Sequence, residues 1–298
     1  MIKETLKGYL DLTRLHFFFV WPTLFLSGLF LSFAQYDGFG WFLIAKAIVI
    51  ALLGFEAGFV LNDWVDRNHD MRDVEVDLTK YWRPFGTRPI PAGKIQPNQA
   101  LMLFFLLAVA ATIVSITLPY PHNIFLIAIQ WYSYAVEYFY QVKKRSQSLP
   151  IAQLIGRTDF TLFPIAGYLA NGFPDAIIVQ YAAFFYPYTM IHLGLNDLID
   201  VANDRVRGLN SITTMYGING TIRWMQVFSI IHLIASFFFM PSFGLITTIA
   251  GGVGALLILS ANMIIKKDPT LKTGLKILPM FHATLLIYSI SMIAEYFV

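Results

Sequence analysis

The sequence predicts an all-α membrane protein with nine transmembrane helices arranged around a central cavity. The first observation is composition: 57% of the 298 residues are hydrophobic and 13% are charged, whereas soluble chains carry about 25% charged residues. The second is the recurrence of apolar runs of about 20 residues, the length that crosses a bilayer. The third is the separation of Lys and Arg onto alternate connections. These observations exclude a soluble globular domain.

The apolar runs define the expected spans in chain order. They lie at 16–35, 41–61, 100–118, 122–141, 150–170, 175–195, 222–240, 243–264 and 277–297. Pro119–Pro121 and Pro241–Gly244 predict tight turns between the third and fourth spans and between the seventh and eighth. The fifth span contains Arg157 and Asp159, and charged residues inside a membrane segment indicate a functional position or an internal ion pair.

The distribution of positive charge predicts the orientation of the chain. With a cytoplasmic N-terminus, every Lys and Arg except Lys46 falls on the inner side, as the positive-inside rule requires. We therefore expect a multi-pass protein of the cell membrane, with one domain over residues 1–298. Its long inner loops, about 63–99 and 197–221, are expected to carry the chemistry on the cytoplasmic side.

Each long inner loop begins with the same nine-residue pattern, N-D-x-x-D-x-x-x-D, at 62–70 and again at 196–204. On a helix, the three aspartates of one copy lie within about 60° of arc. Clustered carboxylates repel one another unless a cation lies among them, and their hard oxygen atoms suit Mg²⁺. Because Mg²⁺ often completes its shell with substrate phosphates, two facing copies predict a diphosphate held through metal ions. The predicted catalytic and metal-binding residues are Asp63, Asp66, Asp70, Asp197, Asp200 and Asp204.

The acidic and basic residues of these loops each have an alternative explanation. A single acidic copy is explained by a solvated helix end, but two copies in the same register favour a metal site. The Arg residues near the copies have a second explanation as charges that orient the membrane segments. Their clustering beside six carboxylates favours binding of a leaving diphosphate, which Arg contacts through a bidentate fork.

With these motifs, the chain resembles the UbiA superfamily of intramembrane prenyltransferases from end to end. The first motif is matched by Asn62, Asp63, Asp66 and Asp70, and the second by Asp197, Asp200 and Asp204. The R-P-[IL]-P-[SA]-G turn of the family is matched by Arg88–Gly93. The segments Arg14–His16 and Trp21–Leu24 are similar to the first helix of the branch that uses aromatic acceptors. Asn62–Trp64 with Asp66 and Arg67 is also similar to the chlorophyll-synthase branch.

The resemblance implies a reaction, a cofactor and substrate-binding residues. A polyprenyl group would pass from a prenyl diphosphate to a hydrophobic acceptor, expected to be aromatic and of the lipoquinone type. Two Mg²⁺ ions would bind the diphosphate, and arginines would neutralise its growing charge. An aromatic cavity would shelter the allylic cation. The implied substrate-binding residues are Asn62, Arg67, Arg88, Arg14, Arg207, Asn196 and Tyr134.

Three departures from the family pattern concern the acceptor side of the site. The stretch Met71–Thr87 is longer than expected and contains a second Arg-Pro pair, Arg83-Pro84. The Lys that usually follows the second motif is absent from Gly208–Ser211, and Glu137 replaces a Lys usual in the fourth helix. Four charged residues within spans are open to two interpretations, an internal ion pair or a wall of the acceptor pocket: Glu56, Glu137, Arg157 and Asp159.

Several other functions remain possible or are excluded at this point. The acceptor alternatives are a glycerol-phosphate ether lipid, a tetrapyrrole and a haem. A cation or small-solute transporter is the alternative class, but it would place acids near the bilayer midplane. A CDP-alcohol phosphotransferase would need a D-G-x-x-A-R element, which is absent. The chain has no Cys, which excludes thiolate catalysis. The expected partners are the two substrates and the bilayer; no nucleic acid or protein partner is expected.

Overall fold

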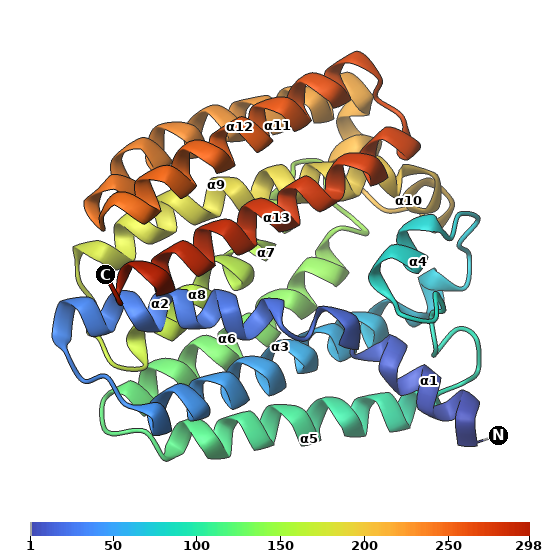
Figure 1. Cartoon of the computed structure of the whole chain (residues 1–298). Coiled ribbons are helices and arrows are strands. Elements are labelled where there is room, and N and C mark those ends of the chain that lie inside the picture. Colours follow the sequence, from blue (N-terminus) through green and yellow to red (C-terminus); the bar gives the residue numbers. More distant parts are fainter. Residues whose placement is uncertain (1) are drawn as a thin grey trace.

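The computed structural model describes residues 2–298, and the described chain is helical without a β-strand. The elements in chain order are α1 (Ile2–Leu12), η1 (Leu15–Phe17), α2 (Val20–Tyr36), α3 (Trp41–Asp70), α4 (Asp77–Trp82), α5 (Pro97–Ile116), α6 (His122–Lys143), α7 (Ile151–Gly156), α8 (Thr158–Leu169), α9 (Ala176–Ile199), α10 (Val201–Arg207), α11 (Ile212–Phe239), η2 (Met240–Ser242), α12 (Leu245–Lys267) and α13 (Leu271–Glu295). The long helices run side by side, and the short helices α1, α4 and α10 gather at one end of the bundle (Figure 1). Both acidic motifs lie at that end.

Close helix crossings hold the middle of the bundle together. At the crossing of α2 and α8, a Cβ on Gly28 would lie 1.8 Å from the Pro164 carbonyl oxygen. A Cβ on Gly167 would lie equally close, 1.8 Å, to the carbonyl oxygen of Phe25. Only glycine therefore permits these two backbones to approach so closely. This crossing brings the aromatic side chains of α2 and α8 to the same wall of the interior.

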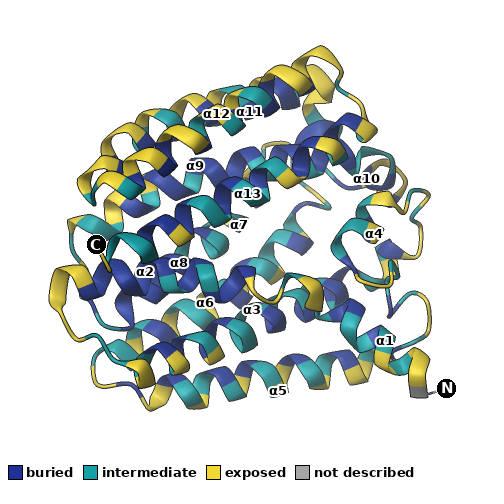
Figure 2. Ribbon diagram, in the orientation of Figure 1, coloured by how far each residue is buried: buried dark blue, intermediate teal, exposed yellow. Residues whose placement is uncertain are grey.

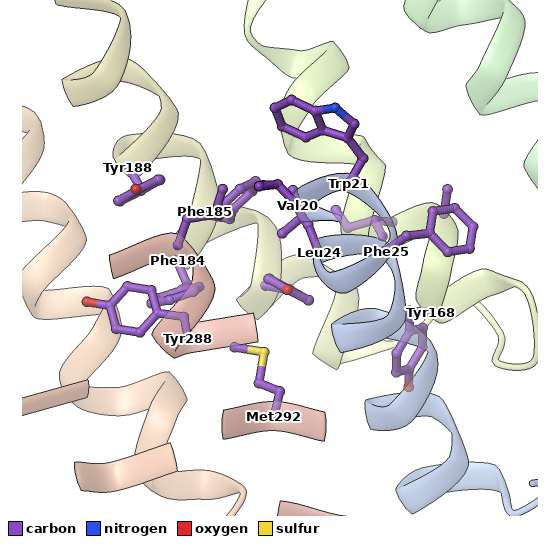
Figure 3. Packing of buried hydrophobic residues seen from close by; sticks show 14 of the residues in the cluster. Val20, Trp21, Leu24, Phe25, Tyr168, Phe184, Phe185, Tyr188, Tyr288 and Met292 are labelled. Carbon is purple, nitrogen blue, oxygen red and sulfur yellow. The ribbon is translucent and has the colours of Figure 1, made fainter. Parts of the chain in front are cut away.

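The core is rich in aromatic side chains. Trp21 stacks on Phe55 with ring centroids 3.9 Å apart, and Phe184 packs against Tyr288 with centroids 5.2 Å apart. Figure 3 shows Trp21 of α2, Phe184 of α9 and Tyr288 of α13 among the buried side chains of this cluster. Offset and edge-on ring contacts of this kind add to the free energy of apolar burial. The core thus forms a rigid wall behind the acidic end of the bundle.

The outer faces of several helices are apolar and exposed. On α5, α11 and α12, exposed residues lie along the outside of the bundle (Figure 2); those on α11 include Phe237 and Phe238, which are 74% and 72% exposed. Apolar surfaces of this extent are typical of helices that face lipid. The protein is therefore an integral membrane protein.

The predicted count of nine spans is not confirmed. Within residues 2–298, six helices have the length and apolar composition of a membrane span: Leu15–Tyr36, Trp41–Asp70, Pro97–Ile116, Ile212–Ser242, Leu245–Lys267 and Leu271–Glu295. The expected spans at 122–141, 150–170 and 175–195 correspond to α6, the α7–α8 pair and α9. These segments carry polar residues toward the interior, and Arg157 separates α7 from α8 within the fifth span. The helices α7 and α8 have 6 and 12 residues, so neither is long enough to cross a bilayer alone. Polar residues in α6 and α9 lower the apolar signal that a membrane span usually shows.

Candidate active site

A cavity of about 320 Å³ opens between the ends of α3 and α9 and extends into the bundle. Its polar part is lined by residues of both acidic motifs. Its apolar part is lined by aromatic and aliphatic side chains, among them Trp21, Phe25, Phe55, Phe59, Phe160 and Phe163. The helix α4 covers the polar part with Leu78, Thr79 and Trp82. A charged head and an apolar tail of one ligand would both find matching surfaces here.

The first motif lies on the last turns of α3, which continues without a break to Asp70. Asp63 and Asp66 lie at the two edges of the predicted arc, and the structure gives them different neighbours. Asp63 accepts hydrogen bonds from Arg83 Nη2 at 2.8 and 2.9 Å and from Arg14 Nη2 at 3.2 Å. Asp66 accepts from Lys144 Nζ at 2.7 Å and from Arg145 Nη2 at 3.1 Å. Only Asp66 of the two lines the cavity.

Asp70 lies between the two motifs. Its Oδ2 accepts a hydrogen bond of 2.7 Å from Arg88 Nη1, and Arg207 Nη2 lies 3.5 Å from its Oδ1. Both arginines also contact Asp73, three residues further along the chain. Arg207 comes from α10, where its Nη1 lies 3.2 Å from Asp200 Oδ2. One guanidinium therefore joins the first motif to the second.

The second motif differs from the first in its backbone. α9 ends at Ile199, and Asp200 takes φ −91° and ψ 8°, so that α10 begins in a new direction. Asp197 remains on α9, where its Oδ2 accepts a hydrogen bond of 2.7 Å from the backbone N–H of Ile212, at the start of α11. A carboxylate in this position satisfies a free N–H group of the helix terminus. Asp197 therefore has a structural contact that its sequence position did not predict.

The ion pairs of this region form a set with balanced charge. Six carboxylates contact six cations: Asp63, Asp66, Asp70, Asp73, Asp200 and Asp204 meet Arg14, Arg83, Arg88, Lys144, Arg145 and Arg207. Paired charges avoid most of the penalty that isolated buried charges would carry. Among the described residues 2–298, no three Asp, Glu or His side chains converge as a ready metal site, because the cations separate them.

Outside the membrane spans, these contacts shift pKa values in opposite directions. Burial alone would lower the pKa of Arg88, but the carboxylates of Asp70 and Asp73 outweigh it and raise that pKa above its ordinary value. Burial raises the pKa of Asp204 to about 8, and the nearby carboxylates of Asp200 and Asp197 contribute in the same direction. Asp204 is therefore the acidic residue of the second motif that most needs an additional cation.

The donor atoms of this site fit a hard divalent cation. Asp70 and Asn196 line the cavity, and the Oδ1 atom of each is buried and accepts no hydrogen bond. Buried oxygens without a donor are costly, and oxygen is the ligand that Mg²⁺ prefers. Side chains able to hold the ion from the cavity are Asn62, Asp66, Asp70, Asn196, Asp197, Asp200 and Asp204.

Most of the predicted site residues line the one cavity, but two do not. The structure places eleven of them on its wall: Arg14, Asn62, Asp66, Asp70, Arg88, Tyr134, Asn196, Asp197, Asp200, Asp204 and Arg207. Asp63 is outside it and is held by Arg14 and Arg83. Arg67 turns away from it, since its Nη1 donates to the Trp64 carbonyl oxygen and its guanidinium lies 4.6 Å from the Trp64 ring. Asp63 as a metal ligand and Arg67 as a diphosphate ligand stay predictions, and neither side chain lines the cavity in this structure.

Four charged residues of the site were missed by the sequence analysis. In the sequence, Arg83 stands out only as part of a second Arg-Pro pair. Asp73 lies three residues after Asp70, the last aspartate of the first motif. Lys144 and Arg145 form a basic pair at the end of α6. The spacing of Asp73 was an available signal. The contacts of the three cations join positions 20 to 79 residues apart, which local patterns do not reveal.

Comparison with known proteins identifies the family. A model of the UbiA prenyltransferase family matches residues 19–285. The chain belongs to the UbiA prenyltransferase family. Among curated relatives, it is 28% identical to the 4-hydroxybenzoate octaprenyltransferase of Psychromonas ingrahamii, over 74% of this chain and 72% of the relative. It is 30% identical to the digeranylgeranylglyceryl phosphate synthase of Saccharolobus solfataricus, over 78% and 77% of the two chains.

Solved structures of UbiA homologues share this fold. A UbiA homologue from Aeropyrum pernix K1 in its apo form matches with a TM-score of 0.75 at 16% identity, covering 94% of this chain and 98% of that one. A UbiA homologue from Archaeoglobus fulgidus bound to GPP and Mg²⁺ matches with a TM-score of 0.69 at 16% identity, covering 96% and 99%. This chain is a UbiA-type prenyltransferase, as the resemblance implied.

Proposed function

We propose that this prenyltransferase transfers a polyprenyl group from a prenyl diphosphate to a hydrophobic acceptor within the membrane, with Mg²⁺ as its cofactor. The observation that carries the proposal is the charge-balanced set of six carboxylates and six cations at the mouth of an apolar cavity. The head of the donor would bind in the polar part, and its chain would extend along the aromatic wall. The homologue bound to GPP and Mg²⁺ supports this assignment.

Charge balance also bears on the transporter alternative. Most carboxylates of the two motifs are already paired with arginine or lysine, so a lone cation would compete with these basic side chains. Magnesium ions and a diphosphate carry charges that nearly cancel. When they bind together, the carboxylates can turn to the metal ions and the arginines to the phosphates, and no large uncompensated charge is left. The two acidic motifs lie at the ends of α3 and α9, which Figure 1 shows at the same end of the bundle. We therefore favour the enzyme over a transporter.

The side chains have separable tasks in the reaction. Bound Mg²⁺ would supply charge neutralisation for the diphosphate. Arg88 and Arg207 would donate hydrogen bonds to phosphate oxygens as the bond from C1 of the prenyl group to oxygen breaks. The aromatic side chains of α2, α3 and α8 exclude water from the allylic cation and present ring faces to it. The acceptor then forms the new bond to C1 and loses a proton.

The acceptor is proposed to be an aromatic compound of the lipoquinone type, with a glycerol-phosphate lipid as the second candidate. The first follows from the Arg14–Leu24 segment and from the relative named a 4-hydroxybenzoate octaprenyltransferase. The second follows from the relative named a digeranylgeranylglyceryl phosphate synthase, which is the more identical of the two. Tyr134 remains a candidate contact, although its hydroxyl donates to the Gly54 carbonyl oxygen at 3.0 Å.

The membrane topology is also a proposal, and it combines the helix bounds with the distribution of positive charge. We infer that α6, the α7–α8 pair and α9 also cross the membrane, for nine crossings in a single domain with two related acidic motifs. The N-terminus and the site would then face the cytoplasm, because the positive charges fall on that side. Labelling of single cysteines placed at the connections of this cysteine-free chain would test each crossing.

An assay of diphosphate release tests the function. Purified protein in detergent, given geranylgeranyl diphosphate, Mg²⁺ and a panel of aromatic and glycerol-phosphate acceptors, should release diphosphate and form a prenylated product. Asp66→Ala with Asp200→Ala should lower the rate at least about 100-fold, since an electrostatic contact at the reacting group is worth that much. Release that persists in the double variant would refute the proposed site.

A further inference from the structure

Three polar residues of α6 form a row that faces the first motif. Glu137, Gln141 and Lys144 are spaced by four and three residues, which places them within about 60° of one helix face. α3 presents Asn62 and Asp66, which are one turn apart, and all five residues line the cavity. We call Glu137, Gln141 and Lys144 the α6 ladder.

Hydrogen bonds join the α6 ladder to the motif from end to end. Asn62 Nδ2 donates to Glu137 Oε1 at 2.7 Å, and Gln141 Nε2 donates to the same oxygen. Lys144 Nζ donates to Gln141 Oε1 and, at 2.7 Å, to Asp66 Oδ2. Gln141 is fully buried. The series therefore links the amide that begins the motif to its central carboxylate.

The charges at the two ends of Gln141 determine how its amide is oriented. Its N–H group faces a carboxylate and its carbonyl oxygen faces an ammonium group. In the reverse orientation, two donors and two acceptors would face each other, the N–H group at the ammonium and the carbonyl oxygen at the carboxylate. The same reasoning applies to Asn62. Because Glu137 accepts from the Asn62 Nδ2, the Oδ1 of that amide is the atom that remains for a cavity ligand. An amide oxygen can bind Mg²⁺, but an amide nitrogen cannot.

We propose that Glu137 and Gln141 are positioning residues, which orient the Asn62 amide and hold Lys144 against Asp66. The inference rests on the proposed function and names how the first motif is prepared for its metal. Residues that orient metal ligands commonly change metal affinity 10- to 100-fold when they are replaced. Glu137 also lies near Arg157 and Asp159, so Gln141, whose side-chain contacts all lie within the α6 ladder, gives the cleaner test.

The test compares Gln141→Leu with Gln130→Leu. Gln130 also lies on α6 and donates to the Ala108 carbonyl oxygen at 2.8 Å and to Thr112 at 3.1 Å, so each variant loses the hydrogen bonds of one glutamine side chain of this helix. Thermal unfolding of the full chain in detergent is followed while Mg²⁺ is titrated at fixed inorganic diphosphate. The Mg²⁺ concentration for half-maximal stabilisation should rise about tenfold in Gln141→Leu and stay unchanged in Gln130→Leu.

Two further arms make the outcome decisive. Glu137→Gln preserves size and removes the charge, so it should raise the same Mg²⁺ concentration, and it replaces Gln141→Leu if that variant does not fold. Unaltered Mg²⁺ dependence in the folded variants would overturn the positioning role. A wild-type protein that neither responds to Mg²⁺ with diphosphate nor transfers a prenyl group would instead overturn the proposed function.

Discussion

Asp63 and Asp66 are three residues apart on one helix, yet they belong to different parts of the site. Asp66 lines the cavity and contacts Lys144 and Arg145, whereas Asp63 joins α3 to Arg14 and Arg83. Arg14 also lies 3.9 Å from the Phe59 ring on α3. The two carboxylates therefore have different surroundings: Asp66 faces the cavity, and Asp63 holds Arg14 and Arg83.

Removal of Asp63 should cost stability more than a change on the surface does. Asp63→Ala leaves two buried guanidinium groups without a carboxylate, and a broken buried pair costs about 3–5 kcal/mol. Asp77→Ala is the control, because its ion pair with Lys80 is exposed and such pairs contribute little. Unfolding in detergent measures both variants. Equal free energies of unfolding would contradict the structural role of Asp63.

Gly58 provides a test of where the donor chain lies. It lines the cavity, and a Cβ at this position would meet nothing within 4 Å. Gly58→Leu should therefore fold and fill part of the apolar channel. We expect kcat/KM for geranylgeranyl diphosphate to fall about 10-fold or more relative to that for geranyl diphosphate, in line with an overpacking cost of 1–3 kcal/mol.

A matched glycine controls for the effect of an added side chain. Gly252 is exposed on α12, and a Cβ there also meets nothing within 4 Å. Gly252→Leu should leave the ratio of the two donors unchanged. If Gly58→Leu also kept the wild-type ratio, the donor chain would not pass this face of α3.

At the scale of elements, α9 connects the two ends of the bundle. It begins after Asp175, whose carboxylate accepts from the backbone N–H groups of Ile177 and Ile178 at 2.9 and 3.3 Å. It ends at the turn that carries Asp200. The Asp175 cap fixes where the helix begins, and the turn at Asp200 fixes where it ends. The position of the second motif relative to the cavity therefore depends on both termini.

The cap at Asp175 should make stability depend on pH. Burial raises the pKa of Asp175, but hydrogen bonds from Tyr168 and Tyr36 outweigh it, and the pKa lies below its ordinary value. Because the folded pKa is lower than the unfolded value of about 3.9, the stabilisation is present above that pH and is lost as pH falls through the folded pKa. Asp175→Ala should lower stability by about 1 kcal/mol at neutral pH.

Melting temperatures of wild type and Asp175→Asn, followed from pH 7 downward, measure this effect. Asn can still cap the helix but does not titrate, so the difference between the two proteins should shrink in acid. A difference that stays constant down to about pH 3, below the unfolded pKa, would show that the carboxylate charge is not involved.

At the scale of the whole molecule, the long helices build a rigid apolar wall, and the short helices α1, α4 and α10 close its polar end (Figure 1). The connection that contains α4 is held from two sides. Asp11 of α1 accepts from the backbone of Phe85 and Thr87 at 2.7 and 3.1 Å, and Asn203 of α10 accepts from Val74 and Glu75, each at 2.9 Å. The covered end is thus assembled from segments distant in sequence.

Ligands that bind across this end should stabilise the whole fold. A ligand at 100 times its Kd adds about 2.7 kcal/mol to the free energy of unfolding. We therefore expect Mg²⁺ with inorganic diphosphate to raise the melting temperature, and a chelator to remove the effect. Asp200→Ala, which lacks one contact of Arg207, should respond weakly. Equal stabilisation by diphosphate with and without the chelator would contradict a metal-bridged site.

Local patterns were sufficient for much of the site. Two acidic motifs in the same register, and the turn at Arg88–Gly93, placed eleven of the thirteen predicted residues on one cavity. Asp63 and Arg67 lie outside that cavity, because helical spacing tells which residues share a face but not which neighbour that face meets. The repeat also suggested equal geometry for both motifs, whereas the second bends at Asp200.

By itself, the sequence determined the helical membrane class, the two motifs and the family, because apolar runs and residue spacing are properties of neighbouring residues. Only the tertiary structure decided which cation meets which carboxylate. Arg14 reaches Asp63 over 49 positions, and Arg207 reaches Asp73 over 134. Such pairs form only after the helices have packed, and the free energy of that packing comes from the apolar wall rather than from the charges themselves.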